Sequence, residues 1–162
     1  MEVQYAYLAE NWGKPVIPAA AMPVLEYHVE HPDPGSKFEG VVAKLAGLPT
    51  RRKMEVLMSK GFDCLLGIHE QLLVSFLAIQ RDPPKIGLFK AHTEEAFRHN
   101  GYGVGTLAKL VQTEFADSRV EYICAGEGKN TRMTALLTSL KNRYESALAL
   151  SVNLDTGFIY RA

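Results

Sequence analysis

The chain has little of several features that would narrow its class at once. Of its 162 residues only Cys64 and Cys124 are cysteines, too few and too far apart for a disulfide framework or a zinc site. Lysine plus arginine and aspartate plus glutamate each sum to 18, so charge gives no reason to expect nucleic acid or an anionic membrane as a partner. No apolar run approaches the roughly 20 residues of a membrane span. No metal-ligand cluster is visible, so no metal is expected.

The remaining composition is that of an ordinary globular domain, with 47% apolar and 22% charged residues. The apolar stretch 16–24 is interrupted by Pro18 and Pro23 and lacks a preceding basic segment, which argues against a signal peptide. The low cysteine content then favours the reducing cytoplasm. We expect an N-terminal extension over residues 1–22, packed on the surface of a single domain that covers residues 23–162.

The most informative segment is 98–106, which reads Arg-His-Asn-Gly-Tyr-Gly-Val-Gly-Thr and is followed at once by an apolar helical pattern. Three glycines at alternate positions remove side chains from the backbone where a helix begins. Free N–H groups at the positive end of a helix dipole attract anions. The segment therefore predicts a site for a phosphate or pyrophosphate.

Two common phosphate-binding patterns fit this segment poorly. The P-loop is excluded because none of these glycines is followed by lysine. The dinucleotide fingerprint Gly-x-Gly-x-x-Gly/Ala is met loosely by Gly103, Gly105 and Ala108, with Glu127 at a tolerable distance for a ribose contact. That fingerprint belongs at the start of a series of βα units, whereas one further helix is expected here. Nucleotide binding stays open as an alternative.

A third pattern, Arg/Gln-x-x-Gly-x-Gly/Ala, is met without a gap by Arg98, Gly101 and Gly103. On these residues the chain resembles the GCN5-related N-acetyltransferase (GNAT) superfamily, in which this loop holds the pyrophosphate of coenzyme A. The resemblance implies acetyl-CoA or coenzyme A as co-substrate.

The hydrophobic periodicity predicts an α/β (α+β) fold with a mixed sheet and helices on both faces. In chain order the expected elements are β-α-α-β-β-β-α-β-α-β-β. The strands are expected over 23–30, 62–69, 72–80, 86–93, 120–124, 148–153 and 156–160, and the helices over 36–47, 50–61, 107–117 and 131–144. Thr50 is the expected N-cap of the second helix. Over roughly 23–160 this order also resembles the GNAT superfamily.

The resemblance implies a set of cofactor-binding residues around the loop. The backbone of Ala91, His92 and Thr93 would meet the pantetheine arm of coenzyme A. Arg98 would cap the loop, and Asn130 at the start of the last helix completes the set. The pyrophosphate would be bound by the hydroxyl of Thr106 and by the amides of His99, Asn100, Gly101, Tyr102, Gly103 and Val104.

The acid and base residues depart from the family pattern. Many relatives place a Glu or His on the strand before the loop, where this chain has Gly87 and Phe89, neither of which can transfer a proton. Other relatives use a carboxylate at the end of the following strand. Glu127 occupies that place when the last helix is aligned through Ala135. It is the candidate catalytic base, and it fits a solvated residue at a strand end equally well.

In the same alignment Ser139 takes the place of the helix tyrosine that protonates the leaving thiolate. Aligning through Asn130 instead puts Leu137 there, and Leu137 is no acid. Tyr144 is a third candidate, although it lies on the apolar stripe of the helix and fits a packed core position equally well.

We therefore expect an enzyme that transfers an acetyl or short acyl group from coenzyme A to an amine, by direct attack of the amine on the thioester. The acceptor would be a small molecule or a peptide, and a homodimer stays open. The alternative is a binding module of the same fold that retains coenzyme A and has lost catalysis. The two hypotheses differ in one observable, because only the enzyme releases free coenzyme A thiol.

Overall fold

The computed structural model describes residues 3–8, 46–125 and 131–162. Most of the N-terminal extension, the strand expected over 23–30 and nearly all of the helix expected over 36–47 lie outside the described residues. Glu127 and Asn130 lie outside them as well. From residue 48 onward, the described elements follow the expected order.

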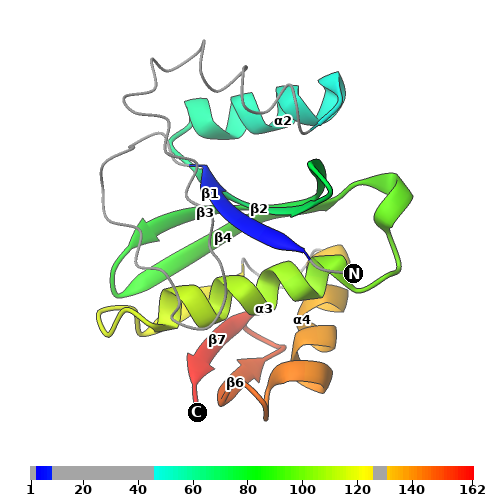
Figure 1. Cartoon of the computed structure of the whole chain (residues 1–162). Coiled ribbons are helices and arrows are strands. Elements are labelled where there is room, and N and C mark those ends of the chain that lie inside the picture. The colour runs from blue at the N-terminus through cyan, green and yellow to red at the C-terminus, as the bar shows by residue number, and fades with distance from the viewer. Residues whose placement is uncertain (1–2, 9–45, 126–130) are drawn as a thin grey trace.

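The described strands form one seven-stranded sheet in the order β1-β2-β3-β4-β5-β7-β6 (Figure 1). Its strands are β1 (Gln4–Leu8), β2 (Asp63–His69), β3 (Leu72–Asp82), β4 (Lys85–Thr93), β5 (Tyr122–Cys124), β6 (Leu150–Asn153) and β7 (Phe158–Arg161). Every neighbouring pair is antiparallel except β4 and β5, which run parallel. The predicted mixed sheet is confirmed.

Helices cover both faces of the sheet, as predicted. Helix α2 (Leu48–Ser59) packs on one face, whereas α3 (Tyr102–Phe115) and α4 (Thr131–Tyr144) share the other. Strands β2 and β3 are buried from Cys64 to Ile68 and from Leu73 to Ile79, and these stretches are almost wholly apolar because both of their faces are covered. Leu65 and Leu77 point into the core under α3, while Leu66 and Phe76 point into the core under α2.

Tight turns fix the register of the antiparallel half. Glu70 and Gln71 both have positive φ, 49° and 64°, which is the conformation of a two-residue type I′ hairpin. The turn expected at Asp82-Pro83-Pro84 joins β3 to β4, with β4 starting directly afterwards at Lys85.

Two N-terminal predictions are wrong. Part of the expected extension is the edge strand β1, which pairs antiparallel with β2 and buries Tyr7 and Leu8 to 1% exposure. Strand β1 is too short for its alternation of apolar residues to be recognised in the sequence, and its pairing with the distant strand β2 stabilises it. Thr50 is not the N-cap of α2, because the helix already starts at Leu48, with Gly47 at the cap and Pro49 in the first turn, where proline is tolerated.

In the βαβ unit β4–α3–β5, one edge of β4 has no strand partner among the described residues along much of its length. The register pairs β4 with β5 only from Lys85 to Gly87, while β4 continues from Leu88 to Thr93. Within the described residues no helix is long and apolar enough to cross a membrane.

Candidate functional site

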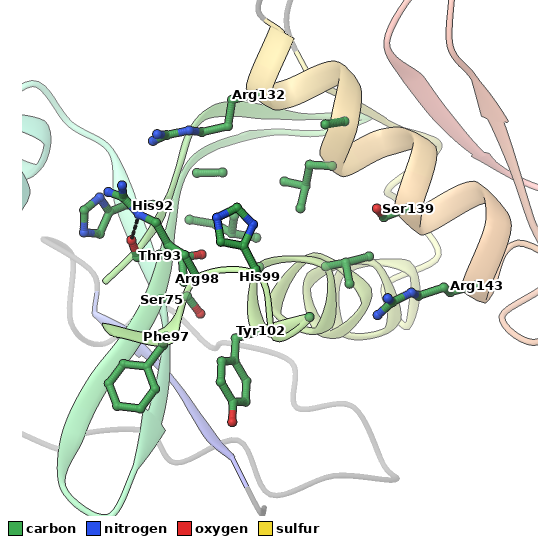
Figure 2. A pocket seen from close by; sticks show the side chains of 17 residues that line it. Ser75, His92, Thr93, Phe97, Arg98, His99, Tyr102, Arg132, Ser139 and Arg143 are labelled. Atoms are coloured by element: carbon green, nitrogen blue, oxygen red, sulfur yellow. Dashed lines mark hydrogen bonds between the residues drawn. The ribbon is translucent and has the colours of Figure 1, made fainter. Parts of the chain in front are cut away.

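A pocket of about 440 Å³ lies where the end of β4, the glycine loop and helix α4 meet (Figure 2). It is lined by Ser75, Leu77, Ala91, His92, Thr93, Phe97, Arg98, His99, Gly101, Tyr102, Gly103, Val104, Arg132, Ala135, Leu136, Ser139 and Arg143. The structure therefore brings the glycine loop and the preceding strand together in one cavity, with α4 as the opposite wall.

The glycine loop ends in the first-turn amides of helix α3. Gly101 is the N-cap of α3 in the left-handed conformation (φ 83°), and the N–H of Gly105 makes the first intrahelical hydrogen bond to the Gly101 carbonyl oxygen (3.0 Å). The amides of Tyr102, Gly103 and Val104 precede that bond and have no partner within the helix. Helix α3 thus begins earlier than predicted, inside the glycine segment, and directs its positive end at the pocket.

Gly103 keeps the space between β4 and α4 open. A Cβ at this position would lie 3.2 Å from Thr93 Oγ1 and 3.5 Å from Leu136 Cδ1. Both neighbours line the pocket, from β4 and α4 respectively. Any side chain at Gly103 would therefore narrow the cavity beside the first-turn amides of α3.

The charged side chains among the described lining residues of the pocket are all basic, although the formal net charge of the whole chain is zero. Arg98, Arg132 and Arg143 line it, and none of its described lining residues carries a carboxylate. Arg143 of α4 lies beside the loop, because its Nη1 atom is 2.9 Å from where a Cβ on Gly101 would stand. Arg98 Nε donates to the Thr93 carbonyl oxygen (3.1 Å) and so ties the loop to the end of β4. This arrangement favours an anionic ligand.

His92 belongs to β4, but its ring contacts residues on the face of the sheet that α2 covers. Its Nε2 atom lies 2.8 Å from Glu94 Oε1, and the ring stacks on Phe76 with centroids 5.1 Å apart. Burial lowers the pKa of His92 below its ordinary value of 6.5, and the neighbouring Glu94 opposes that shift. Glu94 also accepts a hydrogen bond from Thr50 on α2. The neutral imidazole therefore serves to connect β4 to α2.

Several predicted binding residues line the pocket, and two do not. Ala91, His92, Thr93, Arg98, His99, Gly101, Tyr102, Gly103 and Val104 line it. Asn100 is not among the lining residues, and its side-chain amide donates within the loop to the Arg98 carbonyl oxygen (3.1 Å). The predicted contact of the Thr106 hydroxyl with a pyrophosphate is wrong. That hydroxyl is buried, donates to the Tyr102 carbonyl oxygen (2.8 Å) and shares a hydrogen bond with Ser75.

The predicted catalytic residues differ in where they lie relative to the pocket. Ser139 lines the pocket from α4. Tyr144 does not line it and packs against the hydrophobic core, as its place on the apolar stripe suggested. Glu127, the expected base, lies outside the described residues.

Sequence reasoning missed the arginines of α4. Arg132, Ser139 and Arg143 follow one another at i, i+7 and i+11, a spacing that places all three on one helix face. The sequence contains this polar stripe. The apolar stripe through Leu137 and Leu140, however, led us to interpret the helix only by the face that packs on the core.

Neither a protein-family model nor a curated protein sequence matches the chain. Among solved structures, similar folds include a ribosomal-protein-alanine N-acetyltransferase from Brucella melitensis (24% identity, 58% of this chain and 62% of that one, TM-score 0.40). A diaminobutyrate acetyltransferase from Paenibacillus lautus, in complex with its substrate and coenzyme A, is 18% identical, with 54% and 52% covered and a TM-score of 0.41. A GNAT family acetyltransferase from Elizabethkingia anophelis with acetyl-CoA bound is 12% identical, with 70% and 81% covered and a TM-score of 0.43.

The chain spans about half the length of the Paenibacillus enzyme.

Proposed function

We propose that the chain transfers an acetyl or short acyl group from coenzyme A to an amine, as members of the GNAT superfamily do. One observation supports this above all others: the first-turn amides of α3, which come before the first hydrogen bond within the helix, lie at the same pocket as the part of β4 that no described strand pairs with on that edge. Coenzyme A carries a pyrophosphate followed by an arm with two amide groups. A helix N-terminus suits the first, and a free strand edge suits the second.

The pocket offers a defined role to each group of residues. The amides of Tyr102, Gly103 and Val104 would bind the pyrophosphate, and Arg143 would add charge beside them. The backbone of β4 between Leu88 and Thr93 would hydrogen-bond the pantetheine arm and so direct the thioester away from the loop. The acceptor nitrogen then attacks the thioester carbonyl carbon, and the C–S bond breaks to release the thiolate.

For the proton of the amine we propose Glu127 as acceptor, on the sequence alignment alone. Glu127→Gln is then expected to lower turnover by about 10²- to 10⁴-fold while leaving coenzyme A affinity intact. The loss should shrink at alkaline pH, where more of the acceptor amine arrives deprotonated. A pH–rate profile identical to the wild type would assign proton removal to solvent. Ser139→Ala should matter less, since a thiolate leaves without a strong acid.

Binding is tested by two glycine variants on the same helix. Gly103→Ala places a methyl group inside the pocket, whereas Gly105 lies outside it, where an added Cβ meets Tyr5 OH at an ordinary 3.4 Å. Both replacements favour the helix to a similar degree, so each variant's melting temperature is compared with and without acetyl-CoA. We expect Gly105→Ala to keep the ligand-induced increase and Gly103→Ala to lose most of it. Equal increases in both variants would refute the phosphate site.

The second candidate function is a coenzyme A-binding module without catalysis. It is favoured by the absence of a carboxylate among the described lining residues and by Ser139 in place of a tyrosine on α4. A screen for thiol release from acetyl-CoA over a library of amines separates the two, because the module binds the ligand and releases none. Binding of NAD in place of coenzyme A would instead support the nucleotide-binding alternative.

A further inference from the structure

The described helices cover the two faces of the sheet to different extents. In the register of β4, β5 and β7 the residues Ile86, Ile123 and Ile159 lie side by side, and all three belong to the core under α3 and α4. Because side chains alternate along a strand, the residues next to these isoleucines point to the opposite face. Helix α2 lies on that face, but its buried side chains pack with those of β1, β2 and β3 (Figure 1). Over β5 and β7 no described helix covers it.

Aromatic side chains gather on this face. Tyr122 of β5 and Phe158 and Tyr160 of β7 pack on one another, with ring centroids 5.3, 5.9 and 6.0 Å apart. On β4, Phe89 is 59% exposed and its ring stacks on that of Phe62, with 4.6 Å between the centroids. Phe62 packs against the core under α2, which places Phe89 on the same face. These residues form what we call the aromatic face. None of them belongs to the buried core, so core packing does not account for them.

Small residues separate the two groups of rings. Gly87 pairs with Cys124, and Cys124 pairs with Phe158 on the next strand. Neighbouring strands lie about 4.8 Å apart, so about 10 Å separates Gly87 from Phe158. A Cβ added to Gly87 would meet, among the described residues, only the Gln80 carbonyl oxygen, at 3.8 Å. Between the rings of Phe89 and Phe158 there is therefore room for a group about as wide as one aromatic ring.

The aromatic face adjoins the proposed coenzyme A site. A second pocket, of about 340 Å³, includes Phe89 and Ala91 in its lining and shares Ala91 with the larger pocket. The pair Gly87 and Cys124 is also the last position at which β4 and β5 are paired, beyond which β4 continues to Thr93. If the proposed function holds, on which this inference rests, a pantetheine arm that runs along β4 from the glycine loop brings its thioester to this separation of the strands. The acceptor amine would then approach from the aromatic face.

The side chains along this approach are aromatic or small. An aromatic ring binds between other rings through offset or edge-to-face contacts, and the electron-rich face of a ring attracts an ammonium group. We propose that the acceptor is a small primary amine that carries an aromatic ring, with the ring bound between Phe89 and Phe158. One strand spacing, about 5 Å, separates Cys124 from Phe158. A linker of about two carbons, as in 2-phenylethylamine, would span that distance and direct the nitrogen at the thioester.

A free amine suits the site better than the N-terminus of a peptide. A peptide backbone binds to an exposed strand edge through main-chain hydrogen bonds. The unpaired edge of β4 from Leu88 to Thr93 would already be occupied by the pantetheine arm. The aromatic face contributes side chains, which are suited to holding a ring.

The experiment measures binding to the coenzyme A-loaded protein, so it does not depend on turnover. Dissociation constants are compared for 2-phenylethylamine and 2-cyclohexylethylamine, which have the same linker, the same charge and rings of equal carbon number. Apolar burial alone gives the phenyl ring no advantage, so a preference for it reports contact with aromatic residues. We expect 2-phenylethylamine to bind about 3- to 10-fold more tightly.

The preference should depend on the two flanking rings. Phe89→Leu and Phe158→Leu keep an apolar side chain, and each is expected to lower the ratio of dissociation constants by about 2- to 3-fold. The double variant should bring the ratio to about 1. Phe115→Leu is the matched control, because Phe115 is a half-buried phenylalanine on α3, against the other face of the sheet. It should keep the wild-type ratio.

Melting temperatures without ligand verify that each variant is folded. Phe89 is the more exposed of the two flanking residues, so Phe89→Leu alone decides the question if Phe158→Leu does not fold. A tripeptide with N-terminal phenylalanine and its cyclohexylalanine analogue are compared in the same way. A preference seen with these peptides and not with the free amines would overturn the small-amine acceptor in favour of a peptide.

The remaining outcomes separate this inference from the proposed function. Failure of coenzyme A itself to bind would refute the proposed function. If coenzyme A binds and the phenyl and cyclohexyl forms bind equally well, the aromatic acceptor site is refuted alone. An undiminished preference in Phe89→Leu and in the double variant would also refute it, since the rings named here would then not contact the ligand.

Discussion

At the scale of single residues, Arg143 offers the sharpest test of ligand charge. Its guanidinium lies beside Gly101 and has no hydrogen bond or ion pair within the described residues. We expect Arg143→Gln to weaken coenzyme A binding by about 10-fold, since a charge-assisted contact is lost, and to leave the free energy of unfolding unchanged. Titration calorimetry measures the affinity.

Two controls accompany this prediction. Arg52→Gln removes an exposed arginine of α2 on the opposite face of the sheet and should leave the affinity unchanged. Pantetheine, which carries no phosphate, should bind wild type and Arg143→Gln equally. An undiminished affinity for coenzyme A in Arg143→Gln would show that Arg143 does not contact the anion.

The lowered pKa of His92 predicts how the free energy of unfolding depends on pH. Burial lowers its pKa in the folded state below 6.5, so the unfolded chain takes up the proton first as the pH falls. The contribution of His92 to stability is therefore present above pH 6.5 and is lost as the pH falls toward the lowered pKa. Urea unfolding at pH 8 and pH 5.5 should show a smaller loss for His92→Gln than for wild type. Equal losses in both proteins would contradict this account.

At the scale of elements, α3 is the helix that positions the anion site. Leu107 and Leu110 are completely buried against the sheet. Truncating either to alanine should lower the free energy of unfolding by about 2–5 kcal/mol, as measured in urea. The matched control is Leu48→Ala, because Leu48 is 48% exposed and should cost about 0.5 kcal/mol or less. Near-neutral effects at both buried positions would be inconsistent with the packing of α3.

Local sequence signals predicted most of the elements from residue 48 onward. The α3 stripe through Leu107, Leu110 and Val111 reports a 3.6-residue period, and all three side chains are buried as that period requires. The turn at Glu70-Gln71 was placed correctly because its flanking strands are long and apolar. The glycine loop was found from residue type and spacing, which depend on backbone geometry alone.

Features that depend on distant contacts could not be predicted. Strand β1 pairs with β2, which begins more than 50 residues later in the chain. The hydroxyl of Thr106 suited an anion by residue type, yet the packing of α3 on β3 turns it toward Ser75. Arg132 and Arg143 become binding candidates only once α4 forms the opposite wall of the pocket.

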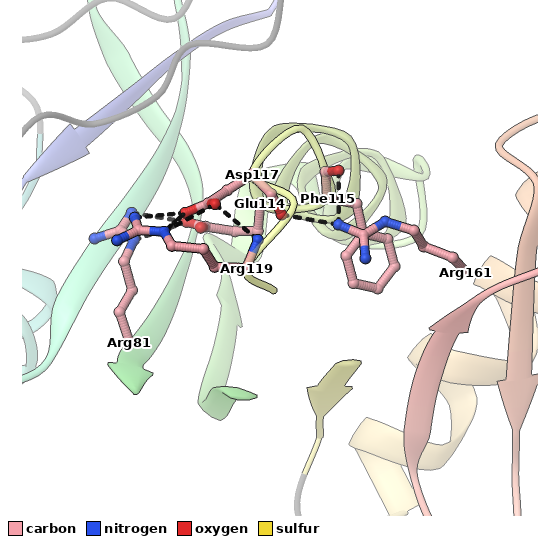
Figure 3. Close-up of polar contacts among 6 residues, drawn as sticks. All are labelled: Arg81, Glu114, Phe115, Asp117, Arg119 and Arg161. Atoms are coloured by element: carbon pink, nitrogen blue, oxygen red, sulfur yellow. Dashed lines mark hydrogen bonds and ion pairs between the residues drawn. The ribbon is translucent and has the colours of Figure 1, made fainter. Parts of the chain in front are cut away.

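At the scale of the whole molecule, polar contacts hold the C-terminal end of α3 from two sides (Figure 3). Arg81 of β3 donates from Nε to Glu114 Oε1 (3.0 Å), and Arg161 of β7 donates to the carbonyl oxygens of Phe115 (2.9 Å) and Asp117 (2.8 Å). Cations are favourable at this end of a helix dipole. The opposite, N-terminal end of α3 faces the pocket.

The Glu114 carboxylate also connects α3 to β1. Tyr7 OH donates to Glu114 Oε1 (2.8 Å), although the two residues are 107 positions apart in the chain. The Arg81 guanidinium lies 4.6 Å from the centre of the Tyr7 ring and also pairs with Asp63 (2.7 Å). Burial raises the pKa of Tyr7 well above its usual value, so its hydroxyl remains a donor at physiological pH. One partly buried cluster thus joins β1, β2, β3 and α3.

This cluster predicts a measurable coupling between the edge strand and the helix. In a double-mutant cycle of Tyr7→Phe and Glu114→Gln, the effects on the free energy of unfolding should deviate from additivity by about 0.5–3 kcal/mol, because both variants act on one hydrogen bond. The control cycle pairs Glu114→Gln with Tyr160→Phe. The Tyr160 ring packs against those of Tyr122 and Phe158 on β5 and β7, so its effect should add to within about 0.5 kcal/mol. Additive effects in the first cycle would mean that β1 docks through apolar burial alone, with the hydrogen bond between Tyr7 and Glu114 contributing nothing to the attachment of α3.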